Sequence, residues 1–156
     1  MSELEQPMDH SPAYDEVREN ERAYSLSVIQ RAASWFFWIA GLSIINTVIA
    51  LFSDSTFSFL AGLGMTQLVD SLVLLWNEGL AVVATVINLL IAGVYVFIGI
   101  KARQAIKAAF IIGLILYALD ALIFLNYRLW LPFLFHIFAG YMIFRGLRET
   151  DKYHAM

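Results

Sequence analysis

The chain contains no cysteine among its 156 residues. This absence excludes disulfide bonds, thiolate catalysis, iron–sulfur clusters, zinc sites built on cysteine and lipid attachment through a thiol. Charged residues are also scarce, because Lys, Arg, Asp and Glu together make up 15% of the chain, against about 25% in an ordinary soluble domain. The composition therefore argues against a soluble globular protein.

Sequence motifs of common enzyme sites are missing as well. The chain has no Gly-x-Ser-x-Gly elbow, no His-Glu-x-x-His zinc motif, no phosphate loop and no Gly-x-Gly-x-x-Gly fingerprint. A catalytic metal normally requires three protein ligands, and at about 12–14 Å below the outer ends of the spans only Asp120 and His136 qualify. We therefore expect no enzymatic activity, no cofactor and no metal.

Hydrophobic residues are abundant. They make up 60% of the chain, and the mean hydropathy is +0.71. A chain of this length cannot bury so much apolar surface in its own core, so the surface is expected to face lipid. The net charge of −3 combines an acidic N-terminal segment with basic loops and predicts no nucleic-acid partner. The lipid bilayer is the expected environment.

Four apolar runs are long enough to cross about 30 Å of hydrocarbon as helices, namely residues 34–53, 80–100, 105–126 and 129–147. A fifth run, residues 56–76, is tested by the distribution of Lys and Arg. With four crossings, nine of the ten basic residues lie on one side and only Arg128 on the other, whereas a fifth crossing divides them four against six. The positive-inside rule therefore predicts four spans with both termini in the cytoplasm.

Residues 56–78 are then expected to lie at the outer end of the spans without crossing. The polar residues of this segment share one face of a helix, and they are Thr66, Gln67, Asp70, Ser71, Asn77 and Glu78. The segment contains no Lys or Arg to attract anionic headgroups. We predict an amphipathic helix, either at the outer interface or re-entering the bundle.

The two ends of the chain are polar. Residues 1–30 form an acidic tail with a short juxtamembrane helix predicted from about Pro12 to Gln30, which is either a solvated extension or a partner-binding element. No apolar run precedes residue 34, so we expect no secretory signal. Residues 31–148 are predicted to form one membrane domain and residues 149–156 a cytoplasmic tail. The expected location is a bacterial plasma membrane.

Each predicted span carries one strongly polar residue well inside its outer end, and these residues are Asn46, Asn88, Asp120 and His136. Each lies eight or nine residues from the outer end of its helix, which corresponds to a depth of about 12–14 Å. Small residues share their helical faces: Ser43, Ala50 and Ser53; Ala81, Thr85, Ala92 and Gly99; Ala109 and Gly113; and Gly140. Because small residues allow close helix packing, we expect the four polar side chains to converge inside the bundle.

Two interpretations of this polar layer remain open. In the first, the side chains only hydrogen-bond between helices, and Asn should then replace Asp120 with little loss of stability. In the second, the four residues bind protons or a small polar or cationic ligand, with Asp120 and His136 as the working pair and Asn46 and Asn88 orienting it.

The sequence thus predicts an all-α integral membrane protein with four transmembrane helices in a bundle. An amphipathic or re-entrant helix is expected between the first and second spans. The expected function is that of a non-enzymatic accessory or interaction component, whose partner is another membrane protein or a second copy of the chain. The alternative is a transporter or channel-like protein that uses Asp120 and His136, and a membrane enzyme ranks third.

Overall fold

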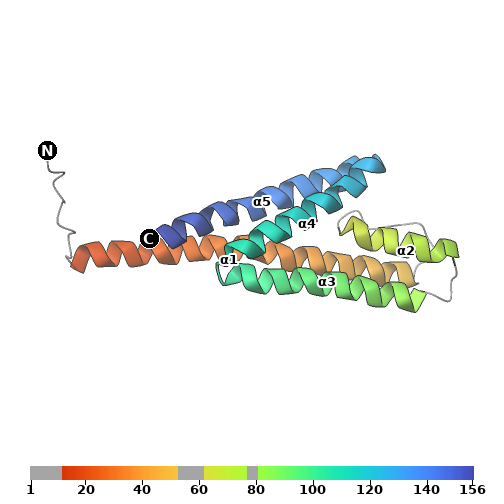
Figure 1. The fold of residues 1–156 in the computed structure, drawn as a ribbon, viewed down its shortest axis with the longest axis horizontal. Coiled ribbons are helices and arrows are strands. Elements are labelled where there is room, and N and C mark those ends of the chain that lie inside the picture. The colour runs from red at the N-terminus through yellow and green to blue at the C-terminus, as the bar shows by residue number, and fades with distance from the viewer. Residues whose placement is uncertain (1–11, 53–61, 77–80) are drawn as a thin grey trace.

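The computed structural model describes residues 12–52, 62–76 and 81–156, which form five α-helices (Figure 1). The helices are α1 (Pro12–Phe52), α2 (Gly64–Trp76), α3 (Ala81–Arg103), α4 (Lys107–Asn126) and α5 (Trp130–Ala155). The all-α class predicted from the sequence is confirmed for these residues. Residues 56–61, 77 and 78 of the predicted amphipathic segment, together with Ser53, lie outside the described residues.

Four of the helices, α1, α3, α4 and α5, are long and apolar enough to cross a membrane. They cover all but one or two terminal residues of each of the four apolar runs found in the sequence, and their presence is compatible with an integral membrane protein. The predicted juxtamembrane helix and the first span form a single helix of 41 residues. The sequence explains this continuity, because no proline or glycine interrupts the chain between Pro12 and Gly41.

The direction of the chain reverses from α1 to α3, from α3 to α4 and from α4 to α5 (Figure 1). The beginning of α1, the turn between α3 and α4 and the end of α5 therefore lie toward the same end, which we call the basic end. It carries all the described Lys and Arg residues except Arg128, which lies in the turn between α4 and α5. Helix α1 packs against α3 and α5, and α4 packs against α5 and α3.

Close contacts between small residues and aromatic rings hold the helices together toward the basic end. A methyl group added to Gly146 on α5 would clash with Ala32 on α1, and one added to Gly113 on α4 would clash with the ring of Phe36 on α1. The ring of Phe36 lies 6.1 Å from that of Phe110, measured between centroids. Because Gly146 has no side chain, α5 approaches α1 directly, and the missing side chain at Gly113 leaves room on α4 for the ring of Phe36.

Two helices end with a residue in the left-handed conformation. Ala105 after α3 has a φ of 57°, and Arg128 after α4 has a φ of 58°. At the end of α4, the amide of Leu129 donates to the carbonyl of Phe124 at 2.9 Å, and that of Arg128 donates to Leu125 at 3.1 Å. This pattern satisfies the last carbonyls of the helix and usually places glycine in the left-handed position.

Helix α2 has 13 residues and is therefore about 20 Å long, which is shorter than the hydrocarbon core of a bilayer. It lies toward the end opposite the basic end, between the pair α1 and α3 and the pair α4 and α5 (Figure 1). It contacts α1, α3 and α4. On its polar face, Thr66 is buried and Asp70 is half-buried, so this face is turned partly toward the protein.

Candidate functional site

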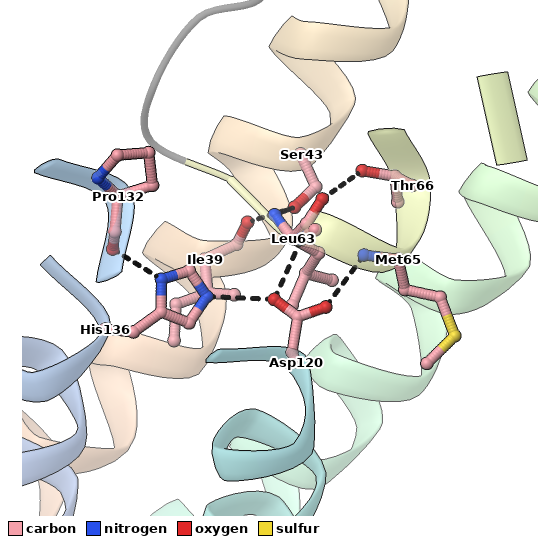
Figure 2. A network of polar contacts seen from close by, with 9 residues as sticks. Ile39, Ser43, Leu63, Met65, Thr66, Asp120, Pro132 and His136 are labelled. Carbon is pink, nitrogen blue, oxygen red and sulfur yellow. Dashed lines mark hydrogen bonds and ion pairs between the residues drawn. The ribbon is translucent and has the colours of Figure 1, made fainter. Parts of the chain in front are cut away.

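Asp120 on α4 is buried and binds the beginning of α2 (Figure 2). Its Oδ2 accepts a hydrogen bond from the amide of Gly64 at 2.8 Å, and its Oδ1 accepts one from the amide of Met65 at 2.8 Å. The first amides of a helix have no partner within the helix and form the positive end of its dipole. Asp120 therefore caps α2 from a different helix.

His136 on α5 completes the environment of this carboxylate. Its Nε2 lies 2.8 Å from Oδ2 of Asp120, and its Nδ1 lies 2.9 Å from the carbonyl oxygen of Pro132. A carbonyl oxygen only accepts hydrogen bonds, so Nδ1 carries a hydrogen. The contact between Nε2 and Oδ2 holds a second one, because neither a bare ring nitrogen nor a carboxylate donates.

Aromatic rings fix the position of the imidazole. The ring of Tyr117 is stacked on that of His136 with 4.3 Å between centroids, and Phe124 approaches it at 4.9 Å. Tyr117 and His136 also line a cleft of about 300 Å³ between α4 and α5, whose other walls are apolar. Both nitrogens of His136 are already hydrogen-bonded, one to Pro132 and one to Asp120. Neither nitrogen is therefore left to bind a molecule in this cleft.

A second set of hydrogen bonds attaches the beginning of α2 to α1 (Figure 2). The amide of Leu63 donates to Oγ of Ser43 at 2.9 Å, and this hydroxyl donates to the carbonyl of Ile39 at 2.8 Å. Thr66 donates through its own hydroxyl to the carbonyl of Leu63 at 2.7 Å. Three helices, α1, α4 and α5, thus contribute side chains to the network that holds the start of α2.

Asn88 on α3 contacts a later turn of α2. Its Nδ2 donates to Oδ1 of Asp70 at 2.7 Å and to Oγ1 of Thr47 on α1 at 3.1 Å. Asn46 has a different environment, because its buried amide packs against Gly62. Within the described part of the chain, both polar atoms of the Asn46 side chain lack a hydrogen-bond partner.

In the structure, the four polar residues that were expected to form one layer make separate contacts. All four predicted residues are buried, and Asp120 and His136 are paired. The expectation that Asn46 and Asn88 orient this pair by hydrogen bonds is wrong, because Asn88 binds Asp70 and Thr47 instead. The physical reason is the position of α2, whose first residues bind Asp120 and whose later residue Asp70 attracts Asn88.

Sequence reasoning did not identify the groups of α2 that Asp120 binds, which are backbone amides. One available signal was the absence of a capping side chain. Gly62 and Leu63 precede α2 in place of the Ser, Thr, Asp or Asn that usually accepts from the first amides of a helix. A helix that starts without such a residue in an apolar environment needs an acceptor from elsewhere, and Asp120 is a buried acceptor of this kind.

Comparisons with protein-family models, with curated proteins and with solved structures find no match to this chain. Among residues 12–52, 62–76 and 81–156, no group of three or more His, Asp or Glu side chains is arranged to hold a metal ion. The chemistry of the site therefore rests on one carboxylate, one imidazole and the amides of α2.

Proposed function

We propose that the protein spans a bacterial plasma membrane four times as a helical bundle, with both termini in the cytoplasm and α2 re-entering from the outer side. The clustering of Lys and Arg at the basic end supports this orientation, because such residues concentrate in cytoplasmic segments. The network at Asp120 supports the re-entrant position of α2, since backbone amides within a membrane require acceptors.

Within this topology, we propose a non-enzymatic accessory or interaction protein whose polar residues serve structure. The observation that carries the proposal is the use of the hydrogen-bonding groups of Asp120 and His136. Both carboxylate oxygens and both ring nitrogens bind partners within the chain. A ligand or transported ion would have to displace these partners, whereas docking α2 needs them all in place.

The first turns of α1 are the proposed interaction surface. Residues 12–24 are exposed, and the first turns of α1 extend beyond the end of α5 (Figure 1). They carry large apolar side chains at Tyr14, Val17 and Tyr24, and acidic residues outnumber basic ones. Exposed apolar residues on a charged helix are typical of a surface that binds another protein. The partner is another membrane protein or a second copy of this chain.

Photocrosslinking in native membranes tests this surface. We expect a photoreactive residue at Val17, which is 55% exposed, to give a discrete adduct whose mass identifies a second copy or another protein. The matched control is Val82 on α3, which is 72% exposed and is proposed to face lipid. Equal, diffuse crosslinking at both positions would remove the proposed surface.

A second candidate function is proton handling by the pair. The specific observation in its favour is the 2.8 Å contact between Nε2 of His136 and Oδ2 of Asp120, because a buried pair of an acid and an imidazole is a component of proton pathways. Proton flux into liposomes that contain the purified protein separates the two functions. The accessory role predicts flux equal to that of protein-free liposomes. Flux that disappears in folded Asp120→Asn and His136→Gln variants would favour transport.

A further inference from the structure

We propose that Asp120 and His136 form a proton-operated latch: binding of one further proton to the pair releases the beginning of α2 from α4. This inference rests on the proposed structural role of the pair and adds regulation to it. The latch consists of the carboxylate of Asp120, the imidazole of His136 and the amides of Gly64 and Met65 (Figure 2).

The geometry of the carboxylate makes the latch sensitive to protons. Three donors converge on its two oxygens: the amides of Gly64 and Met65 and the Nε2 of His136. Every contact is 2.8 Å long, and each oxygen accepts at least one of them. With a single proton shared between imidazole and carboxylate, all these hydrogen bonds are satisfied.

A second proton weakens these contacts. It converts the carboxylate into a carboxyl group while the imidazole keeps hydrogen on both nitrogens, since Nδ1 donates to Pro132. The new hydrogen takes a lone pair of Oδ1 or Oδ2, and both oxygens accept from donors. A carboxyl group is a weaker acceptor than a carboxylate, because its hydrogen bonds are no longer charge-assisted, so the amides of α2 are held less strongly. Protonation also removes the negative charge that the start of the helix favours.

Among the groups around Asp120, the carboxyl of Asp120 itself is the one whose protonation controls the attachment of α2. His136 approaches from α5, and the ring of Tyr117 on α4 is stacked on His136. From α2, Asp70 is engaged with Asn88. Helix α1 contributes the uncharged hydroxyl of Ser43, which binds the adjacent Leu63. Among the described residues, His136 is the basic side chain in hydrogen-bond contact with Asp120.

Release of α2 has a measurable consequence for two adjacent residues. Thr66 is only 1% exposed, whereas its neighbour Met65 is 43% exposed. When the first turn of α2 leaves α4, a side chain at position 66 becomes accessible, while one at position 65 is accessible in both states. The chain has no cysteine, so a single introduced thiol reports each position without interference.

The experiment compares Thr66→Cys with Met65→Cys in the full-length protein in liposomes, labelled by an impermeant thiol reagent between about pH 8 and about pH 5. The ratio of the two labelling rates corrects for the pH dependence of the thiol reaction. We expect this ratio to rise about tenfold on acidification, since release breaks more than one hydrogen bond. In an Asp120→Asn background, we expect a raised ratio at every pH, because the amide replaces one acceptor by a donor.

The outcomes separate the latch from the structural role on which it rests. A ratio that does not change with pH, combined with a raised ratio in Asp120→Asn, overturns the latch and leaves Asp120 as a structural cap. An unchanged ratio in Asp120→Asn at neutral pH overturns both the latch and the structural role. A ratio that still rises with acid in Asp120→Asn assigns the response to another group and overturns the latch. The pH series of the parent chain remains decisive if Asp120→Asn fails to fold.

Discussion

The two ends of the helical assembly are held together by different forces. Toward the basic end, α1, α4 and α5 meet through glycine, alanine and phenylalanine, with Gly146 against Ala32 and Gly113 against Phe36. Toward the opposite end, α2 lies between the helix pairs, and its contacts include hydrogen bonds to Ser43 and Asp120. The basic end combines the fit of apolar surfaces with polar contacts such as Lys107 to Asp151 at 2.6 Å and Ser25 to Glu149 at 2.8 Å. At the other end, the polar contacts include the buried pair of Asp120 and His136 and the amides of α2.

This difference follows from the lengths of the elements. Helices α1, α3, α4 and α5 satisfy their own backbone groups along most of their length, so small residues are sufficient to pack them closely. Helix α2 is short and begins inside the protein, and its first amides need acceptors that only side chains can supply. The buried pair of Asp120 and His136 therefore lies where a helix begins inside the protein.

The largest expected effect is at the polar end, for Asp120→Leu. This change leaves His136 and the amides of Gly64 and Met65 without their acceptor. Loss of one partner of a buried ion pair costs about 3–5 kcal/mol, so we expect the free energy of unfolding in detergent to fall by about that amount. Leu122→Ala, at an exposed position of the same helix, is the control. A similar loss of unfolding free energy in both variants would show that the polar contacts of Asp120 do not contribute more stability than an exposed leucine side chain.

The corresponding change in the apolar packing is Gly146→Ala. The added methyl group clashes with Ala32 and approaches the ring of Phe110, so we expect a loss of about 1–3 kcal/mol in unfolding free energy. Gly93→Ala is the matched control, because nothing lies within 4 Å of the added methyl and alanine is the better helix former. Equal stabilities of the two variants would contradict the close approach of α5 to α1.

A pair of asparagine variants refines the comparison within the polar region. Asn88→Leu removes hydrogen bonds to Asp70 and Thr47, and we expect it to lower the free energy of unfolding by about 1–2 kcal/mol. Asn46→Leu removes an amide that is buried without a partner in the described residues, so stability should stay equal or increase. Thermal unfolding of both variants in one detergent measures the difference. The opposite order of stability would refute the assignment of their contacts.

The smallest effect is expected at a turn of the basic end. Ala105 has a φ of 57°, a conformation that costs an alanine about 1–2 kcal/mol and a glycine very little. Allowing for the greater entropy of an unfolded glycine, we expect Ala105→Gly to raise the free energy of unfolding by about 0.5–1 kcal/mol. Ala102→Gly, in the last turns of α3, should lower it. Destabilisation by both changes would argue against the left-handed turn.

Much of the helical framework is predictable from the sequence, and the contacts of the polar residues are not. Apolar runs longer than a membrane is thick locate α1, α3, α4 and α5, because length and hydropathy are local properties. Counting residues from the outer end of each apolar run also identifies Asn46, Asn88, Asp120 and His136. All four are buried. Their partners depend on the packing of α2, which no local pattern specifies.

The expected tolerance of Asn at position 120 shows where sequence reasoning ends. From the sequence alone, Asn retains the size and most of the hydrogen-bonding capacity of Asp. In the structure, three donors surround the two oxygens of Asp120, so an amide nitrogen in place of one oxygen opposes a donor. The number of donors around a buried carboxylate is a property of the assembled helices.

The sequence by itself determined that the protein is helical, that four of its helices are long and apolar enough to cross a membrane, and that each of these carries a strongly polar residue at a similar depth in its apolar run. These features follow from composition and periodicity along a single segment. Only the tertiary structure decided that α2 separates the polar residues, that Asp120 caps α2 and pairs with His136, and that Asn88 binds Asp70. These contacts join residues far apart in the chain, and they form because a short helix with uncapped amides requires acceptors from its neighbours.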